Sequence, residues 1–446
     1  MSKIYRLSLF ISALFFTAAF VLFYYTDLKS LTIWTTNIWD TLADSGNLRD
    51  YYAYSARNLY GLDHKMVGSD ILIYIPWAIW NLPIWVLQKF FHISIPDHVA
   101  MLLYSKCFLL AVFSLIIYLT SQISKLIIPD RTHRHIVLFL SSTSFFVLTG
   151  IAYIGQNDVL VIASFLAALL ALLKGKRIRF LCFAALSIAF KPFLAFSLLA
   201  LILLYEKNLL KIILFTGCGF SLFFAQKLLF FGAPLYTESL EYGPMQGIAN
   251  LLFQYVLGVP RHGASFFMLG LGAVYILAYF TIPKEAKKAH FTVYFTVAPL
   301  IMLFLFTQYE FYRPIYLMPL IYILFMLRPA YYRTNLILEM VSTLSLMVYY
   351  AFSELLFYHP GFILNLGGNY RMIPSLYDHL LPYLQNYYYY IPGAIFILSM
   401  VMILVINYPD FESQNEVLCR KEEPWLVLVR SLIFAMPLLL SLKIHF

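Results

Sequence analysis

Apolar stretches of about 20 residues, the length of a membrane-spanning α-helix, recur from one end of this chain to the other. Spanning β-strands are shorter and alternate apolar with polar positions, a pattern that is absent here. The 446 residues are 62% hydrophobic and only 12% charged, which is about half the charge of an average soluble domain. A chain so poor in charge is neither a soluble globular enzyme nor a disordered chain. We therefore predict an all-α polytopic membrane protein that forms one integral membrane domain over residues 1–446.

The hydropathy pattern predicts about 13 transmembrane helices. They lie at residues 1–25, 98–127, 135–153, 158–174, 178–190, 192–206, 209–231, 265–282, 290–308, 314–328, 335–358, 389–408 and 425–442. The first is predicted to stay as an uncleaved helix, because its apolar core is too long for a signal peptide. Residues 71–91 contain two prolines and three tryptophans, which favours a helix lying in the membrane interface. The stretch 178–206 is predicted to be two short helices broken at Lys191-Pro192.

The distribution of basic residues predicts the orientation. With a cytoplasmic N-terminus, 19 of the 31 Lys and Arg residues fall on the cytoplasmic side, Arg430 among them, as the positive-inside rule requires. The net charge of +9 is spread over short loops rather than clustered on one face. We therefore expect membrane lipids as surroundings and no nucleic-acid partner.

Three long polar segments then fall on the outer face, at 26–70, 232–264 and 359–388. We divide the chain into an outer loop with juxtamembrane helices at 26–97, a transmembrane core at 98–210 and a second transmembrane half at 211–446. Functional residues concentrate on loops that a rigid scaffold holds. The outer segments are therefore the predicted place for a site.

The first outer segment contains six aspartates, and Asp50 stands at the expected start of a helix. Tyr51 and Tyr54 follow it at helical spacing. Asp is a common N-cap residue, because its carboxylate accepts backbone N–H bonds at a helix start. The alternative is a carboxylate that acts as a general base at the membrane surface. Position alone leaves both interpretations open.

Two further motifs lie in the predicted transmembrane core. Gly155 is followed by Gln156, Asn157 and Asp158, which form either a tight turn between helices or part of a shared cavity on the outer side. Lys191 lies in an otherwise uncharged apolar run, where an ionisable group is costly and indicates function. It either faces a cavity, where a lipid phosphate is its expected anion, or reaches the interface from a helix end.

Arg313 and Arg371 are the other outer cations of interest, because the planar guanidinium fork suits phosphate. Each could instead pair with a nearby acid, Glu310 or Asp378. The chain has no Gly-rich phosphate loop, no HExxH and no GxSxG motif, and its four cysteines have no CxxC spacing. We therefore expect no metal site, no soluble nucleotide and no cofactor.

The ordered set of outer motifs resembles the GT-C class of integral membrane glycosyltransferases, closest to the bacterial α-mannosyltransferase-like and GPI mannosyltransferase-like branches. A pattern like D-x-x-Y-x-x-A-x-x-L-x-x-G is approximated by Asp50, Tyr51, Tyr52, Tyr54, Ala56, Leu59 and Gly61. Tyr74 and Pro76 stand where the family has Y-x-P-P, with the second proline absent. The G-Q-x-[ND] turn matches Gly155–Asp158, and a lysine before proline matches Lys191. The resemblance covers roughly residues 1–210.

This resemblance implies a GT-C-like fold and an inverting transfer of a mannose-like hexose. The donor would be a polyprenyl-phosphate sugar and the acceptor a lipid-linked or cell-envelope glycan, with the site on the extracytoplasmic face. Asp50 would be the base. Lys191, Arg371 and Arg313 would bind the donor phosphate, and the substrate cavity would be lined by Tyr51, Tyr54, Tyr74, Gln156, Asn157 and Asp158. The family's second acid would require an acidic residue at Leu48, so Asp40 is a rival catalytic acid.

Two other classes of protein share parts of this pattern. A polymerase of lipid-linked polysaccharide repeats would need the arginine of 359–388, Arg371, and not Asp50. A transporter or lipid flippase would carry charges along a path through the spans, and Lys191, Glu339 and Glu354 are the clear mid-span charges.

Overall fold

The computed structural model describes residues 3–58, 67–93, 99–241, 256–257, 264–307, 313–352, 362–366, 369–372, 390–410 and 424–445. Helices dominate this part of the chain. The first group comprises α1 (Lys3–Leu22), α2 (Thr26–Asp44), α3 (Tyr51–Arg57), α4 (Ile75–Trp80), α5 (Leu82–Phe91), α6 (Val99–Ile127), α7 (Arg131–Ser142) and α8 (Phe145–Val147). The second comprises α9 (Asp158–Leu173), α10 (Arg177–Phe190), α11 (Ala195–Tyr205), α12 (Leu209–Leu229) and α13 (Tyr236–Glu241). The third comprises α15 (Phe266–Phe280), α16 (Glu285–Phe306), α17 (Leu320–Leu327), α18 (Tyr332–Phe352), α20 (Tyr390–Ile406) and α21 (Pro424–His445).

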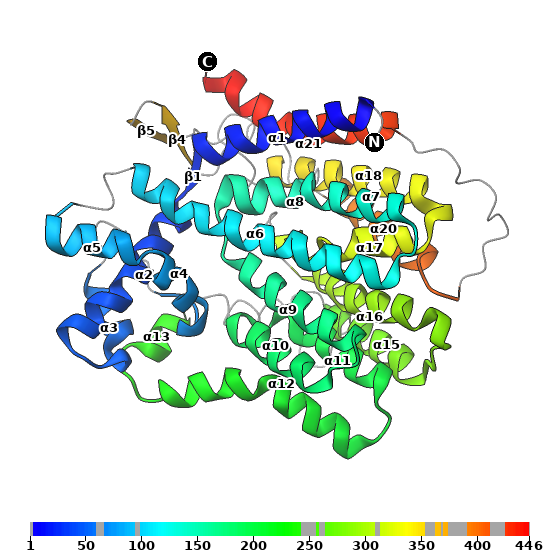
Figure 1. Cartoon of the computed structure of the whole chain (residues 1–446), viewed down its shortest axis with the longest axis horizontal. Coiled ribbons are helices and arrows are strands. Elements are labelled where there is room, and N and C mark those ends of the chain that lie inside the picture. The colour runs from blue at the N-terminus through cyan, green and yellow to red at the C-terminus, as the bar shows by residue number, and fades with distance from the viewer. Residues whose placement is uncertain are drawn as a thin grey trace.

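The helices pack around one extended apolar core to which most of them contribute. Figure 1 shows α1 and α21 side by side along one edge, with α2 to α5 and α13 gathered at one end of the molecule. The pairs α9 with α10, α10 with α12, and α18 with α20 make extensive contacts. The arrangement places the described residues of the predicted outer segment 26–97 against the end of the bundle rather than apart from it.

The predicted helices are present at nearly every expected position, but their lengths support fewer spans than expected. By length and composition, five helices of the described residues could cross a membrane: Lys3–Leu22, Val99–Ile127, Arg131–Ile154, Leu209–Leu229 and Glu285–Phe306. The bent pair Ile71–Trp80 and Leu82–Phe91, which meets at 69°, would make a sixth. Several others are apolar helices of 10–17 residues. The chain is thus a helical membrane protein.

The predicted break at Lys191-Pro192 is confirmed. Helix α10 ends at Phe190, and Lys191 has an extended backbone with φ −154° and ψ 136°. The short 3₁₀ helix η5 (Pro192–Leu194) then leads into α11. A proline disfavours helical geometry at the residue before it and has no N–H to donate, so the helix stops here. The lysine side chain consequently projects from a helix end rather than from a helix face.

The approach to Gln156 is a short π-helix, η4 (Leu148–Ile154), which is buried throughout. It ends at Gly155, whose φ of +78° lies in the left-handed region that favours glycine. The N–H groups of Gly155 and Gln156 both donate to the carbonyl of Gly150. This tight end reverses the chain directly into α9.

Replacing Gly155 by Ala is expected to destabilise the protein by about 1–2 kcal/mol, the penalty for a side chain at left-handed dihedrals. The added Cβ would also lie 3.4 Å from Leu28 Cδ1. Thermal denaturation of the detergent-solubilised protein measures the loss. Gly175→Ala is the matched control. Its φ is +72° and nothing lies within 4 Å of the added Cβ, so it measures the dihedral penalty without the contact to Leu28. An unchanged melting temperature for Gly155→Ala would contradict the strain argument.

Two short antiparallel sheets were not predicted from the sequence. One has the order β1 (Phe23–Tyr25), β4 (Phe362–Leu366) and β5 (Asn369–Met372), and the other pairs β2 (Val256–Leu257) with β3 (Ala264–Ser265). In the first sheet Leu364 pairs with both Phe23 and Arg371. This sheet joins the backbone of the predicted outer segment 359–388 to the start of the segment 26–97.

The loops between helices meet in two groups, one at each end of α9, α10, α11 and α12. In one group Lys207 Nζ donates to the carbonyls of Ala278 and Tyr279, and Lys287 Nζ lies 2.8 Å from Asp410 Oδ1. The other group contains the ion pair of Lys191 with Asp158. The first group of loops contains basic segments that the positive-inside rule places on one side of the membrane. The second group of loops contains the candidate site.

The structure corrects the placement of Arg430. The sequence analysis counted it among the cytoplasmic loop residues, but it lies within α21 and is fully buried. Its Nε and Nη2 atoms each lie 2.8 Å from a carboxylate oxygen of Glu339 on α18, and Tyr322 and Thr143 complete the network. A buried guanidinium needs a paired carboxylate and further hydrogen bonds. Glu339 lies so far from Arg430 in sequence that the charge pattern of either segment alone could not reveal the pair.

Candidate functional site

The centre of the candidate site is an ion pair between Lys191 and Asp158. Lys191 Nζ donates to Asp158 Oδ1, and the side chains are 14% and 3% exposed. Lys191 follows the end of α10, and Asp158 begins α9 after the Gly155 turn. The lysine therefore points inward to a buried carboxylate.

Residues of the next broken segment complete this cluster. The 3₁₀ helix η6 (Arg313–Leu317) presents Tyr316, whose hydroxyl donates to Asp158 Oδ1 at 2.7 Å. The Arg313 guanidinium lies close enough to Asp158 to interact with it electrostatically, and it sits 5.7 Å from the centre of the Phe193 ring. Two cations thus surround one carboxylate. The cluster of Lys191, Asp158, Arg313 and Tyr316, here called the cationic cluster, carries one positive charge in excess.

The rest of the Gly155–Asp158 turn joins the site to the first outer segment. Gln156 Nε2 donates to Asp27 Oδ2 at 2.9 Å, and Asp27 lies in the first turn of α2. Asn157 is 4% exposed and forms the N-cap position of α9 without a side-chain cap bond. The turn thus serves as more than a connection, because its side chains pair with residues of two other segments.

A second ion pair extends the site toward α3. Lys227 Nζ, near the end of α12, lies 2.9 Å from Asp70 Oδ2, and the Tyr236 hydroxyl donates to Asp70 Oδ1 at 2.6 Å. The Tyr236 ring packs against Tyr52 of α3 with centroids 4.9 Å apart. Next to Lys227, Gln226 Nε2 donates at 2.8 Å to the carbonyl of Ala189, in the last turn of α10. Packed contacts therefore connect the segment of Asp50 with that of Lys191.

Asp50 occupies the N-cap position of α3 but makes no side-chain cap hydrogen bond. The capping interpretation of this residue is therefore wrong. Asp50 is half-buried, and among the described residues its carboxylate has no hydrogen-bond or ion-pair partner. The neighbouring Arg49 Nη2 donates to the carbonyl of Phe231 at 2.7 Å, which fastens this turn to the end of α12. Asp50 is thus an open carboxylate on an anchored backbone.

Asp40, the rival acid, has a different environment. It is 5% exposed, its Oδ1 accepts from Trp85 Nε1 at 2.9 Å, and Lys89 Nζ lies 3.7 Å away. Burial raises the pKa of Asp40 above its ordinary value, although the Trp85 hydrogen bond and the Lys89 charge oppose this shift. One oxygen of the Asp40 carboxyl is therefore already engaged, by Trp85 and by the nearby Lys89 ammonium group.

Replacing Asp40 by Asn is expected to stabilise the protein increasingly as pH rises. Because the folded-state pKa is raised above 3.8, the ionised carboxylate opposes folding above that pKa, and this penalty vanishes below 3.8. Asn keeps an acceptor oxygen for Trp85 and carries no charge. Thermal denaturation of both proteins between about pH 4 and pH 7 measures the difference.

Asp44→Asn is the control of opposite sign for this measurement. The hydrogen bond from Lys89, together with that from the Tyr54 hydroxyl, lowers the pKa of Asp44, so its carboxylate favours folding above its unfolded-state pKa. Relative to wild type, the Asp44→Asn variant should become less stable as pH rises. A difference between wild type and Asp40→Asn that does not change with pH would contradict the burial effect.

The tyrosines predicted to line a substrate cavity are mostly packed. Tyr51 is fully buried and donates to the carbonyl of Trp34 at 3.1 Å. Tyr74 is 1% exposed and packs edge-on against Trp34 with ring centroids 6.0 Å apart. Tyr54 donates to Asp44 Oδ2 at 3.1 Å on the outer surface of the segment. These rings support the segment that carries Asp50.

The remaining predicted phosphate ligand, Arg371, is placed only by its backbone. It lies in β5 opposite Leu364, which in turn pairs with Phe23 of β1, just ahead of α2. Glu310, Glu354 and Asp378, the acids considered alongside these cations and spans, lie outside the described residues.

Lys106 is a buried charge that the sequence analysis missed. It lies in α6, is fully buried and donates to three backbone carbonyls. The signal was present, because Lys106 interrupts an apolar run in the same way as Lys191 does. A lysine in the middle of a predicted span indicates either a site or a buried tie between segments.

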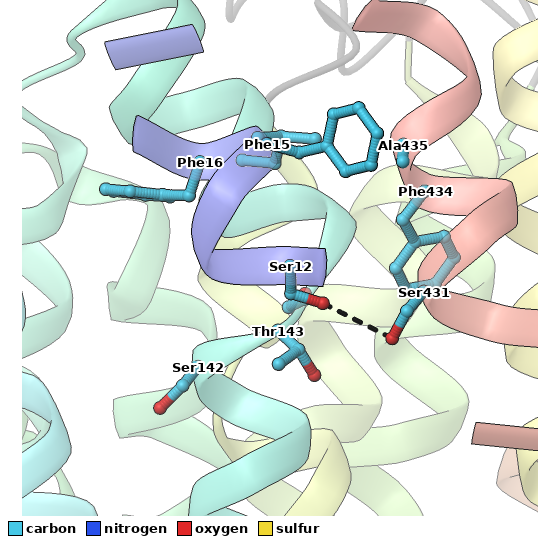
Figure 2. A pocket seen from close by; sticks show the side chains of 10 residues that line it. Ser12, Phe15, Phe16, Ser142, Thr143, Ser431, Phe434 and Ala435 are labelled. Atoms are coloured by element: carbon cyan, nitrogen blue, oxygen red, sulfur yellow. Dashed lines mark hydrogen bonds between the residues drawn. The ribbon is translucent and has the colours of Figure 1, made fainter. Parts of the chain in front are cut away.

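Two pockets are lined by residues outside the candidate site. Figure 2 shows the first, a cavity of about 20 Å3 between α1, α7 and α21, where Ser12 donates to Ser431 at 3.2 Å beside Thr143 and Phe434. This volume suits a single water molecule among hydroxyl groups. The second pocket is mostly apolar and lies near the first turn of α10, around Arg177 and Tyr205. Within the described residues, no group of three or more His, Cys, Asp or Glu side chains could hold a metal ion.

Comparison of the chain with protein-family models, with curated proteins and with solved structures finds no match.

Proposed function

We propose that the chain is a GT-C-like membrane glycosyltransferase. It would move a mannose-like hexose from a polyprenyl-phosphate sugar to a hydroxyl of a lipid-linked glycan or a cell-envelope acceptor. The observation that carries this proposal is the cationic cluster at the break between α10 and α11, in packed connection with the open carboxylate of Asp50. The phosphate of the donor needs cations to bind it, and the hydroxyl of the acceptor needs a base to remove its proton.

In the proposed reaction the acceptor oxygen attacks C1 of the donor sugar from the face opposite the phosphate. The new C–O bond forms as the bond between C1 and the phosphate oxygen breaks, which inverts the configuration at C1. Asp50 takes the hydroxyl proton, and the polyprenyl phosphate leaves with the electron pair. The positive excess of the cationic cluster stabilises the charge on the leaving phosphate.

The environment of each acid supports Asp50 as the base over Asp40. A general base must come within hydrogen-bond reach of the proton that it removes. The Asp50 carboxylate has no partner to displace, whereas the Asp40 oxygen accepts from Trp85 and lies near Lys89. Asp40 has the raised pKa that suits a base, and the transfer assay therefore compares Asn variants of both acids.

The proposal includes the topology that the sequence predicts, with about 13 spans, a cytoplasmic N-terminus and the site on the extracytoplasmic face of the cell membrane. Apolar helices of fewer than 18 residues can serve as spans where neighbouring helices shield their ends. The division of the loops into two groups, with the lysine-rich group remote from the cationic cluster, supports this orientation.

The test is sugar transfer from radiolabelled polyprenyl-phosphate hexoses in membranes that contain the protein, with membranes lacking it as the control. The proposal expects label in a lipid-linked or envelope glycan only when the protein is present. If no hexose donor supports transfer to any offered acceptor, the proposal fails. Joining of preformed lipid-linked repeats would then point to a polymerase, and movement of unmodified lipid between leaflets would point to a flippase.

A further inference from the structure

Lys106 connects two separate stretches of the chain, residues 20–23 and the π-helix η4, through one ammonium group. Its Nζ lies 2.8 Å from the carbonyl oxygens of Phe20 and Phe23, and it also donates to the carbonyl of Ala152. The Phe20 ring lies 4.7 Å below the same atom. An ammonium group has three N–H donors, which matches three carbonyl acceptors.

The three carbonyls belong to places where the regular hydrogen-bond pattern stops. Phe20 lies in the last turn of α1, where helical carbonyls have no N–H partner in the helix. Phe23 begins the short strand β1, and Ala152 lies in the last turn of the π-helix η4. A buried carbonyl without a donor is costly. Lys106 supplies donors to all three oxygens.

Each of these segments leads directly into the candidate site. The chain passes from Phe23 into the first turn of α2, where Asp27 lies, and from Ala152 through Gly155 to Gln156 and Asp158. The two segments then meet again at the Gln156–Asp27 hydrogen bond of 2.9 Å. The Phe23 and Tyr153 rings pack between them with centroids 5.0 Å apart.

The residue before Lys106 anchors the other side of α2. Ser105 Oγ accepts from Trp77 Nε1 at 2.8 Å and is hydrogen-bonded to Thr32 Oγ1 at 2.9 Å. Asn81 Nδ2 donates to the same oxygen at 3.0 Å and to Thr35 Oγ1 at 2.9 Å. Two successive residues of α6 therefore hold α2, α4 and the Gly155 turn against one another.

We propose that Lys106 is a positioning residue, whose ammonium group sets the spacing between the segment of Asp27 and the turn that carries Gln156 and Asp158. Its consequence for sugar transfer rests on the proposed function, but its consequence for the spacing does not. Removing the ammonium frees both segments at once, because one atom is the common partner of their carbonyls.

The spacing is tested by cross-linking in the full-length protein with Cys107, Cys182, Cys218 and Cys419 replaced by Ser. Asp27→Cys and Gln156→Cys are joined with a short bifunctional thiol reagent, with and without Lys106→Met. The rate of cross-linking is expected to fall at least about fivefold in the Met variant, the effect of losing about one net hydrogen bond. A second pair, Lys287→Cys with Asp410→Cys, monitors the other group of loops and should react equally in both proteins.

Sugar transfer is measured separately with Asp27 and Gln156 intact. Lys106→Met is expected to lower kcat by about 100-fold, the effect of displacing catalytic groups by about 1 Å, with a smaller change in KM. Lys125→Met, an exposed lysine in the last turn of the same helix, is the matched control and should transfer normally.

The outcomes separate the two proposals. An unchanged cross-linking rate at the first pair in Lys106→Met overturns the positioning role. If both pairs lose their reactivity, Lys106→Gln, which retains two N–H donors, is tested in the same way. If neither cysteine pair cross-links in Lys106→Gln, the positioning role is overturned in favour of a general requirement for folding. If cross-linking is lost only at the first pair, the positioning role is supported. If wild type transfers no sugar, the proposed function fails while the cross-linking result stands.

Discussion

Replacing Asp50 by Asn is expected to lower sugar transfer by about 10²–10⁴-fold while leaving the protein as stable as wild type, because a general base contributes rate enhancements of that size. The carboxylate makes no cap bond and has no partner in the described part of the chain, so its loss breaks no contact there. Asn has nearly the same shape but cannot take the proton of the acceptor hydroxyl. The effect should therefore fall on kcat and spare the melting temperature.

The measurement compares Asp50→Asn, Asp40→Asn and Asp44→Asn at equal protein level in membranes. Asp44→Asn is the matched control, since this exposed aspartate lies on the same outer segment and pairs with Lys89. Full activity in Asp50→Asn together with loss in Asp40→Asn would move the base to Asp40. Equal loss in all three would indicate that the segment as a whole had been disturbed, against the assignment of one base.

Lys191→Met is expected to destabilise the protein by up to about 3–5 kcal/mol, the cost of breaking a buried ion pair, and to abolish transfer. Asp158 would lose its hydrogen-bonded cation and keep only the electrostatic interaction with Arg313. Asp158 is 2% exposed, and Tyr316 is its remaining neutral partner. Adding Asp158→Asn removes the carboxylate charge that Lys191 paired. The double variant should therefore regain most of the lost stability but no transfer, since the lysine proposed to bind the phosphate is still missing.

Thermal denaturation and transfer assays on the single and double variants measure both parts of this prediction. Lys227→Met is the matched control for stability, because Lys227 and Asp70 form a comparable pair whose lysine is more exposed, at 25% of its side chain. It should lose less stability than Lys191→Met. Recovery of transfer in the double variant would contradict a phosphate-binding role for Lys191 and leave it a purely structural one.

The sequence predicted those features of the fold that depend on local patterns. Long apolar runs located α6, α12 and α16, and the proline after Lys191 located the break between α10 and α11. The short sheets were not predictable, since β1 and β4 are joined only by pairing between segments far apart in the chain. Neither was the number of long spans, because several apolar runs form helices of only 10–17 residues.

The candidate site was predictable as a set of residues but not as a set of partners. Lys191, Asp158 and Arg313 were each chosen for their residue type and position, and the structure brings all three together. The partner of Gln156 is Asp27, one of six similar aspartates in the first outer segment, and no spacing rule singled it out. The pairing of Arg430 with Glu339 likewise depends on tertiary contacts between distant helices.

The packing of α1 against α21 has a consequence for the biogenesis of the protein. Ser8 and Val427, which are hydrogen-bonded at 3.3 Å, are 419 residues apart, so α1 enters the membrane long before its partner has been synthesised. Until α21 arrives, Glu339 also lacks the guanidinium that neutralises it. Membrane insertion therefore proceeds while α1 lacks one of its packing partners and Glu339 lacks its counter-ion, and the arrival of α21 supplies both. A chain that ends before α21 would leave the surface that α21 covers, including the charged Glu339, unpacked. Membrane proteases would recognise and remove such a chain by this surface.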